Sequence, residues 1–281
     1  MKLLLPPGLG DLHWTLLKMQ GLIERVCPGK VPKVFIASND PNKNRGGDYL
    51  DSIPFVEWGG YIDIRRDRAS FTSAFTRGTK IHGYTAPSGE KFDLFYSNNH
   101  DVERGLRPRD WFPEGGPVDY AYPVQLDLKM CPIPDEPYVL VSLYRHGWYA
   151  DWWEHEPPML VIEAIRRALP EHRIILTGAV WDAKLCKAVA EKNRVESWAG
   201  KTSLRELLVL IKHAECWIGH AAGNAMLAVH LKTPTVMIWG HPPFSRQMWA
   251  CWAPPGARHY VPYDVHGGMK LTDAIAKAVH P

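Results

Sequence analysis

The sequence predicts an α/β protein of two domains with parallel sheets, and three observations support this prediction. Strand-like and helix-like segments alternate along most of the chain, which is typical of parallel strands joined by helical crossovers. The 281 residues exceed the size of one ordinary core and suit two domains. The proline-rich stretch 131–137 lacks the amide donors of a central strand, so we place the boundary there. The expected domains are residues 1–130 and 131–281.

The first domain is predicted to open with a strand, a glycine turn and a helix. Residues 2–5 are the strand, and Gly8-Leu9-Gly10 is the turn. Pro28-Gly29 ends the helix, and a second strand is predicted at 34–37. The apolar residues of the helix recur at alternating spacings of four and three, which places them on one face: Leu12, Leu16, Met19, Ile23 and Val26. Between residues 41 and 111 there are short strand-like pieces, such as 62–64 and 92–96, and no topology is predicted.

The second domain shows a clearer alternation of strands and helices. Ser203 and Glu206 are spaced as a capping box, which satisfies two amides at the start of a helix. The last helix is a candidate for folding back onto the first domain. The predicted strands cover residues 138–143, 173–177, 195–198, 216–219 and 235–239, and the predicted helices cover 159–169, 182–192, 203–213, 224–231 and 271–279.

The composition excludes several classes of protein. A hydrophobic fraction of 46% with 22% charged residues is typical of a globular chain and not of a disordered one. The five cysteines form no CxxC pair and the histidines have no metal-ligand spacing, so neither a disulfide framework nor a metal site is expected. No apolar run reaches the length of a signal peptide or a membrane span, so we expect a cytoplasmic protein. The net charge of +3 permits an anionic ligand without requiring a polyanion.

Ligands of open α/β sheets bind beyond the carboxyl ends of the strands, and the first unusual strand end is Gly8-Leu9-Gly10-Asp11. Glycines let the backbone turn sharply and approach a ligand. Asp11 begins the helix, where one interpretation is an N-cap. The other is a general base, which the helix dipole would keep ionised and able to accept a proton from a hydroxyl. The two roles compete only in part.

The second unusual strand end is the segment 217–226, which is predicted as a strand, a small-residue turn and a helix. A helix N-terminus presents free amides and a partial positive charge, which suit a pyrophosphate. The residues of the turn have little or no side chain, so a phosphate can come close. The alternative interpretation is a tight turn whose small residues serve packing.

Four segments, in order and spacing, resemble the bacterial heptosyltransferase family of glycosyltransferases. They are residues 8–16, 174–178, 199–207 and 219–239. The resemblance implies a GT-B fold, in which two Rossmann-like domains face each other across a cleft. It implies that the first domain takes the acceptor and the second the nucleotide-sugar. It also implies an inverting single displacement without a metal or other cofactor, with the family's proposed loop base falling on Asp11.

The chain departs from the family pattern in the donor-phosphate segment. The family has Asp-Ser/Thr-Gly and a nearby His, whereas Ala221, Ala222, Gly223 and Met226 stand here. Backbone amides need no particular side chain, so the phosphate cradle is expected to survive while the sugar and base contacts differ. The identity of the donor is therefore left open.

These arguments give a set of candidate site residues. The catalytic candidate is Asp11, and no metal ligand is predicted. The alternative interpretation of Arg145 is an ordinary surface residue, and that of Trp198 is a residue of the hydrophobic core. The acceptor-binding candidates are Gly8, Gly10, His13 and Trp148, the last in an aromatic loop at 148–153. The donor-binding candidates are Ser142, Arg145, Thr177, Gly178, Glu196, Trp198, Lys201, Gly219, Ala222, Gly223, Asn224 and Ala225.

The expected partners are a nucleotide-sugar donor and an anionic acceptor. Basic residues recur between positions 65 and 109, although nearby acids partly cancel them. The acceptor is either a saccharide, as in a lipopolysaccharide core, or a hydroxymethylated pyrimidine in DNA that a phage-type enzyme would glycosylate in its host's cytoplasm. Two other functions remain open: a nucleotide-sugar binding protein without turnover, and a nucleotide-sugar epimerase with the same architecture.

Overall fold

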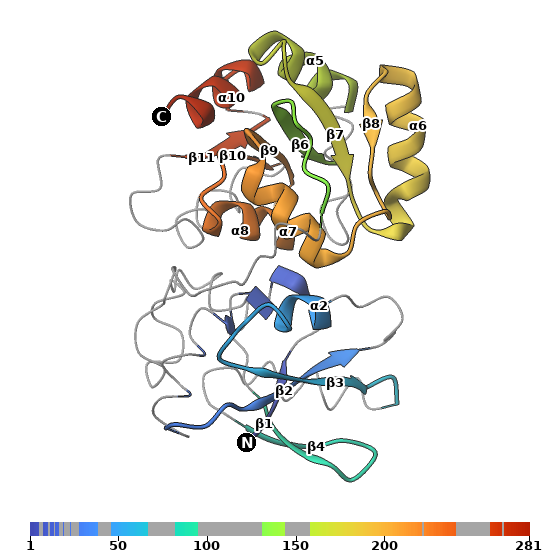
Figure 1. The fold of residues 1–281 in the computed structure, drawn as a ribbon, viewed down its shortest axis with the longest axis vertical. Helices are drawn as coiled ribbons and strands as arrows, with labels where there is room; N and C mark the ends of the chain where they lie inside the picture. Colours follow the sequence, from blue (N-terminus) through green and yellow to red (C-terminus); the bar gives the residue numbers. More distant parts are fainter. Residues whose placement is uncertain are drawn as a thin grey trace. The chain divides into compact units, whose positions relative to one another are not determined.

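The chain divides into two compact units, Met1–Leu126 and Asp127–Pro281. The predicted boundary at residue 131 lies just inside the second unit. Figure 1 shows the chain in a computed structural model. The structure describes residues 1–5, 8–10, 12–13, 15–16, 19, 23, 28–38, 46–66, 82–94, 131–143, 158–220, 222–239, 259–265 and 267–281.

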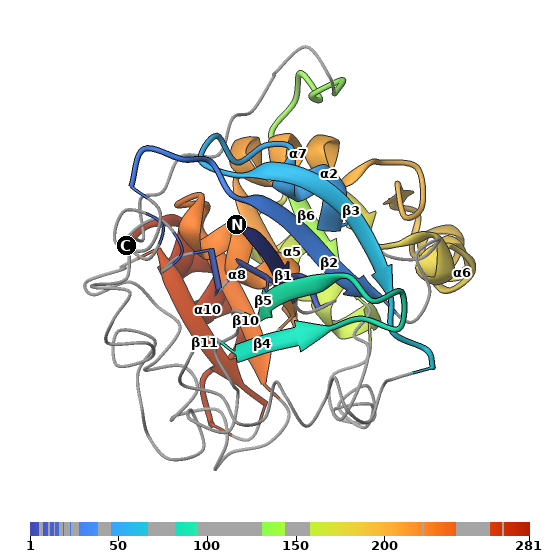
Figure 2. The same cartoon turned by 90° about the horizontal axis from the view of Figure 1, so that it is seen from below.

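Unit 1 contains a five-stranded sheet in the order β3-β2-β1-β5-β4, which Figure 2 shows from below. The pairs β1–β2, β2–β3 and β1–β5 are parallel. The short helix α2, Gly46–Leu50, lies between β2 and β3 in the chain. The strands are β1 (Lys2–Leu5), β2 (Lys33–Ser38), β3 (Glu57–Asp63), β4 (His82–Thr85) and β5 (Lys91–Leu94).

The edge pair β4–β5 departs from the expected parallel sheet, because these two strands are antiparallel. A five-residue turn from Ala86 to Glu90 joins them, closed by a hydrogen bond from Gly89 N to Ala86 O at 2.8 Å. Gly89 has φ = 83°, a left-handed conformation that favours glycine. A parallel connection needs a crossover of a dozen or more residues, so this turn permits only a hairpin.

The helix predicted after β1 is present in its described residues. Leu12, Leu16, Met19 and Ile23 are helical and buried, as their spacing predicted. On one face of the sheet, Leu4, Phe35 and Phe92 contribute to a hydrophobic cluster, in which the two phenylalanine rings meet edge to face with centroids 5.1 Å apart. Val26 lies outside the described residues.

Unit 2 contains a six-stranded sheet in the order β11-β10-β9-β6-β7-β8, with all neighbouring strands parallel. Its strands are β6 (Tyr138–Ser142), β7 (Arg173–Thr177), β8 (Glu196–Ser197), β9 (Cys216–His220), β10 (Thr235–Trp239) and β11 (Tyr260–Asp264). Its helices are α5 (Pro158–Ala168), η5 (Val180–Asp182), α6 (Ala183–Asn193), α7 (Leu204–His213), α8 (Gly223–His230) and α10 (Leu271–Val279).

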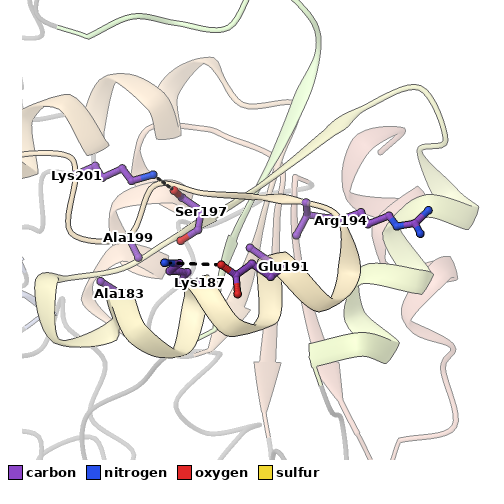
Figure 3. A pocket seen from close by; sticks show the side chains of 9 residues that line it. Ala183, Lys187, Glu191, Arg194, Ser197, Ala199 and Lys201 are labelled. Carbon is purple, nitrogen blue, oxygen red and sulfur yellow. Dashed lines mark hydrogen bonds and ion pairs between the residues drawn. The ribbon is translucent and has the colours of Figure 1, made fainter.

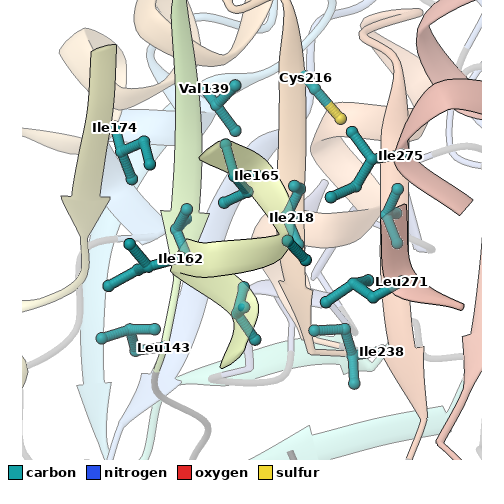
Figure 4. Packing of buried hydrophobic residues seen from close by; sticks show 14 of the residues in the cluster. Val139, Leu143, Ile162, Ile165, Ile174, Cys216, Ile218, Ile238, Leu271 and Ile275 are labelled. Carbon is teal, nitrogen blue, oxygen red and sulfur yellow. The ribbon is translucent and has the colours of Figure 1, made fainter. Parts of the chain in front are cut away.

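Helices pack on both faces of this sheet. On one face, alternate strand residues such as Val139 and Ile218 join α5, α6 and α10 in one buried cluster (Figure 4). The buried residues of α7 and α8 lie outside that cluster, so these helices cover the opposite face. Unit 2 is therefore a doubly wound α/β sheet, as its alternating pattern predicted.

The last helix, α10, belongs to the core of unit 2. Its buried residues Leu271, Ala274, Ile275 and Ala278 form a stripe at helical spacing and join the cluster shown in Figure 4. This differs from the expectation that the helix folds back onto the first domain. The reason is that its single apolar face is already used against α5 and the sheet. In the described part of the chain, no helix is long and apolar enough to cross a membrane.

Candidate functional site

The strand order of unit 2 reverses between β6 and β9. From β6 the chain winds outward to β7 and β8, returns to β9 beside β6, and then winds the other way. Ser142, the last residue of β6, pairs with Gly219 of β9 on one side and with Thr177 of β7 on the other. Such a switch point leaves a crevice at the carboxyl ends of the strands, where open α/β sheets bind ligands. Three predicted donor-binding residues therefore meet at one place.

The glycine at the end of β9 serves close packing between strands. A Cβ built on Gly219 would lie 2.7 Å from the carbonyl oxygen of Ser142 and 2.9 Å from the indole of Trp217. Real Cβ atoms do not approach backbone so closely, so no side chain fits here without movement of β6 or β9. The packing interpretation of this residue is therefore supported by the structure.

The N-terminus of α8 has no capping side chain among the described residues. The helix starts at Gly223 behind Ala222, an extended N-cap with φ = −141° whose side chain makes no capping hydrogen bond. The amides of Ala225 and Met226 donate to Ala222 O, at 3.0 and 3.3 Å. Within the described residues, the amides of Gly223 and Asn224 have no hydrogen-bond partner. These two donors and the positive end of the helix dipole are what an anion requires.

A side-chain contact fixes this helix start to the switch point. Asn224 donates from Nδ2 to Oγ of Ser142, at 2.9 Å. Ser142 is 4% exposed, so its hydroxyl acts as a buried anchor for Asn224. Thr177 is also buried, and its hydroxyl lies 3.4 Å from Val141 O. The side chains of Ser142 and Thr177 are therefore buried and hydrogen-bonded within the protein. The first turn of α8, in contrast, is partly exposed.

The turn after β7 is compact and well braced. A Cβ on Gly178 would lie 2.8 Å from Cβ of Asp182, so the glycine makes room for that side chain. Asp182 accepts a hydrogen bond from Ala179 N at 2.7 Å. Gly200, from the turn after β8, donates its amide to Gly178 O at 2.9 Å. The turns after β7 and β8 therefore hold each other in place.

Glu196 and Trp198 form a group with Arg173. The guanidinium of Arg173 donates two hydrogen bonds of 2.8 Å to the carboxylate of Glu196, and these bonds raise the pKa of Arg173. Trp198 Nε1 donates to the same carboxylate at 3.2 Å. The sequence placed Glu196 and Trp198 near a nucleotide base, and the structure shows that both have partners within the protein. Trp198 is half-buried.

Lys201 borders a hollow of about 450 Å³ between α6 and β8 (Figure 3). Its ammonium donates to Ser197 O at 2.6 Å. Lys187 and Arg194 also line the hollow, together with Glu191, while alanines and Val195 form its apolar part. Lys187 lies 3.8 Å from Glu191. The hollow therefore has basic residues along a partly apolar wall, on the outer side of the edge strand β8.

The candidate residues of unit 1 are only partly described. Gly8 O accepts a hydrogen bond from Leu12 N at 2.8 Å, and Gly8 and Gly10 are half-buried. His13 is 1% exposed, and its Nδ1 lies 2.6 Å from the Tyr49 hydroxyl. Burial raises the pKa of Tyr49, so its hydroxyl stays protonated at neutral pH. The role of His13 in acceptor binding stays a prediction. Asp11, Arg145, Trp148 and Ala221 lie outside the described residues.

Two residues near the site were not singled out from the sequence. Asp182 is buried and braces the turn after β7 through the bond described above. Its place four positions after Gly178, at a helix start, was the available signal. Trp181, its neighbour, is 45% exposed. Among the residues that the structure describes, no group of three or more His, Cys, Asp or Glu side chains is placed to hold a metal ion.

Comparison with known proteins gives matches in structure only. No family model matches the sequence, and no curated protein matches it. The fold is similar to E. coli ADP-heptose LPS heptosyltransferase II, with a TM-score of 0.61 and 13% identity over 99% of this chain and 98% of that one. It is also similar to E. coli heptosyltransferase WaaC with ADP, with a TM-score of 0.57 and 16% identity over 98% of each chain.

A third similar structure is the glycosyl transferase family 9 protein from Veillonella parvula DSM 2008. Its TM-score is 0.58 at 10% identity, over 94% of this chain and 85% of that one. These matches span both units, and their low identity indicates a divergent sequence. The chain therefore has the α/β fold of the heptosyltransferase-like GT-B glycosyltransferases, as the four sequence segments predicted.

Proposed function

We propose that this protein is an inverting glycosyltransferase that moves a sugar from a nucleotide-sugar to an acceptor hydroxyl. The observation that carries the proposal is the open N-terminus of α8 beside the switch point, where the amides of Gly223 and Asn224 have no partner among the described residues. The diphosphate of the donor is assigned to these amides. Unit 2 is accordingly the donor-binding half and unit 1 the acceptor-binding half. The fold shared with heptosyltransferases supports this assignment.

The reaction is a single displacement. The acceptor oxygen attacks the anomeric carbon of the sugar while the bond from that carbon to the phosphate oxygen breaks. The nucleoside diphosphate leaves with the bonding electron pair, and the amides of the α8 turn stabilise its developing charge. Lys201 and Arg145 are proposed to neutralise the charge of the same anionic group. The proton of the acceptor hydroxyl passes to Asp11, the proposed general base.

In this proposal, backbone amides bind the diphosphate of the donor, and side chains contact the rest of the nucleotide-sugar. Ala222, Gly223, Asn224 and Ala225 form the turn that receives the diphosphate, anchored through Ser142. At or just beyond the carboxyl ends of the neighbouring strands stand the donor candidates Thr177, Gly178, Trp198, Lys201 and Gly219. Glu196 is the first residue of β8, and its carboxylate bonds Arg173, the first residue of β7. Gly8, Gly10, His13 and Trp148 keep their proposed place at the acceptor. A cytoplasmic location is part of the proposal, since the cysteines predict no disulfide framework.

A saccharide is the leading acceptor in this proposal. One similar structure is, by its name, an enzyme of lipopolysaccharide, which is a saccharide acceptor class. In the described part of the basic segment, the charge of Arg65 is engaged by an acidic neighbour. Arg65 Nε donates two hydrogen bonds of 2.9 Å to Asp63, and this contact lowers the pKa of Asp63 to about 2. A hydroxymethylated pyrimidine in DNA is the second acceptor class, because it presents the same reacting group.

The first experiment tests transfer and the base together. The protein is incubated with UDP-, GDP- and ADP-sugars and a mixture of saccharide acceptors, and products are weighed by mass spectrometry. Asp11→Asn keeps an equally good helix cap but cannot take the proton, so it should lose transfer at least about 100-fold while keeping its stability. Asp11→Ala removes both functions. Full transfer by the Asn variant would remove Asp11 as the base.

The second experiment identifies the acceptor class. Ordinary and hydroxymethylated DNA replace the saccharides, and the digested nucleosides are weighed. A mass increase on the hydroxymethylated base alone would assign the DNA acceptor, and that binding should weaken steeply as salt rises. Product from saccharides only would assign the saccharide class. Donor binding without product on any acceptor would instead favour a binding protein, and conversion of the donor without an acceptor would favour an epimerase.

A further inference from the structure

An exposed apolar cluster follows the carboxyl end of β7. Val180, Trp181 and Leu185 are 59%, 45% and 42% exposed, respectively. These three large side chains lie within six residues, where η5 leads into α6. Single exposed apolar residues are ordinary, but a cluster beside a candidate site indicates a surface that contacts a ligand or partner.

The turn that carries this cluster is rigidly built. Asp182 bonds the amide of Ala179 at 2.7 Å, and Asp182 N donates back to Ala179 O at 3.0 Å. From the other side, a Cβ on Gly200 would lie 3.0 Å from the Cα of Val180. Gly200 itself has φ = 74°, which suits glycine. Because the backbone is braced on both sides, the exposure of Trp181 belongs to an ordered turn.

The position of this turn fits the length of the proposed donor. Strand β6 separates β7 from β9, so the ends of β7 and β9 are two strand spacings apart, or roughly 10 Å. The open amides of α8 follow β9, and η5 follows β7. In a nucleoside diphosphate, one phosphate and a ribose separate the base from the terminal phosphate. A diphosphate on α8 therefore brings its base toward η5 when the nucleotide lies across the ends of β6 and β7.

The chemistry of the cluster selects the base over other groups of the donor. A nucleobase has flat apolar faces and stacks on aromatic rings, whereas sugar and phosphate require polar partners. Trp198, the stacking residue expected from the sequence, is half-buried and donates its indole hydrogen to Glu196. Trp181 is the more exposed indole at this edge.

We propose that Trp181, with Val180 beside it, is the platform on which the base of the donor nucleotide stacks. This inference rests on the proposed function and names the residue that determines base affinity in the same site. Stacking contacts the face of a base and not its edge. Because a purine has a larger ring system than a pyrimidine, Trp181 should bind purines more tightly. The edge of the base is left to other polar groups of the site.

The test compares a nucleotide with its phosphate part alone. Binding of ADP, GDP, UDP and inorganic pyrophosphate to the wild type and to Trp181→Ala is measured by calorimetry. Trp181→Ala should weaken ADP and GDP about tenfold or more, weaken UDP less, and leave pyrophosphate unchanged. Trp181→Phe should keep ADP affinity within about threefold, because a smaller ring still stacks. Leu185→Ala is the matched control from the same cluster and should bind all four ligands like the wild type.

The outcomes separate this inference from the proposed function. If the wild type binds nucleoside diphosphates and Trp181→Ala binds them equally well, only the stacking platform is overturned. An equal loss for ADP and pyrophosphate would overturn it as well, because the change would then act on the turn as a whole. If the wild type binds neither nucleotide nor pyrophosphate, the donor site itself fails, and the platform with it. A change of oligomeric state in Trp181→Ala, with nucleotide affinity intact, would assign the cluster to an interface between copies of the chain.

Discussion

Helices α7 and α8 contact each other, yet their N-termini are built in opposite ways. At the start of α7, Ser203 Oγ accepts from Glu206 N at 3.2 Å, and Glu206 accepts from Ser203 N at 2.6 Å. At the start of α8, Ala222 makes no capping bond from its side chain. The capping box places the carboxylate of Glu206 at the start of α7, where it would repel an anion, whereas no side chain of this kind stands at Ala222. The comparison supports the proposal that the anion site lies at α8 and not at α7.

The largest effect is expected when α8 is given the kind of cap that α7 has. In Ala222→Asp, the new carboxylate accepts from the amides of the first turn and repels a diphosphate. Nucleoside diphosphate affinity should fall about tenfold or more, which is 1.4 kcal/mol, by calorimetry. The free energy of unfolding should rise by about 1 kcal/mol in a denaturant titration.

Ala222→Ser serves as the neutral control for this substitution. A serine caps the helix without a full charge, so stability should rise as in the Asp variant while affinity falls less. Unchanged nucleotide affinity in Ala222→Asp would show that the amides of α8 are not the diphosphate site.

A smaller effect, confined to stability, is expected at α7. Ser203→Ala removes the cap and should lower the free energy of unfolding by about 1 kcal/mol. The corresponding fall in melting temperature is about 2–4 °C, measured by circular dichroism. Nucleotide affinity should not change, because the carboxylate of Glu206 stays at the start of α7 and disfavours an anion there. A loss of affinity equal to that of Ala222→Asp would contradict the distinction between the two helices.

The smallest effect is expected at the contact that holds α8 to β6. The hydrogen bond from Asn224 to Ser142 should couple the two residues by about 0.5–1.5 kcal/mol in a double-mutant cycle of Asn224→Ala and Ser142→Ala. Denaturant unfolding of the four proteins measures this term. Strictly additive losses would mean that the contact does not fix the start of α8.

The features that the sequence predicted best depend on neighbours within a few residues. The capping box of α7 involves Ser203 and Glu206 alone, and the apolar stripe of the first helix follows from its spacing. Strand β3 was harder to predict, because it begins at Glu57 and runs through Gly59 and Gly60 without a strand-like alternation. A Cβ on Gly59 would lie 2.7 Å from the ring of Phe35, a contact between strands that no local pattern reveals.

The candidate site likewise has features that follow from local patterns and features that depend on contacts between distant residues. The carboxyl ends of β6, β7 and β9 were predictable as ligand positions, because sheet topology places them at one edge. The pairing of Glu196 with Arg173 was not, since it depends on the register of β7 against β8. The burial of His13 against Tyr49 likewise joins residues 36 positions apart. Contacts between residues far apart in the sequence could not be predicted, because neither residue type nor spacing indicates which residues will meet.

The packing of α10 has a consequence for how the protein can change over time. With this helix completing the cluster around β10 and β11, every described residue of that hydrophobic cluster belongs to unit 2. Recombination near residue 127 would thus exchange one half of the protein while leaving the other half's interior whole. Under the proposed function, such an exchange of halves would combine the acceptor site of one protein with the donor site of another.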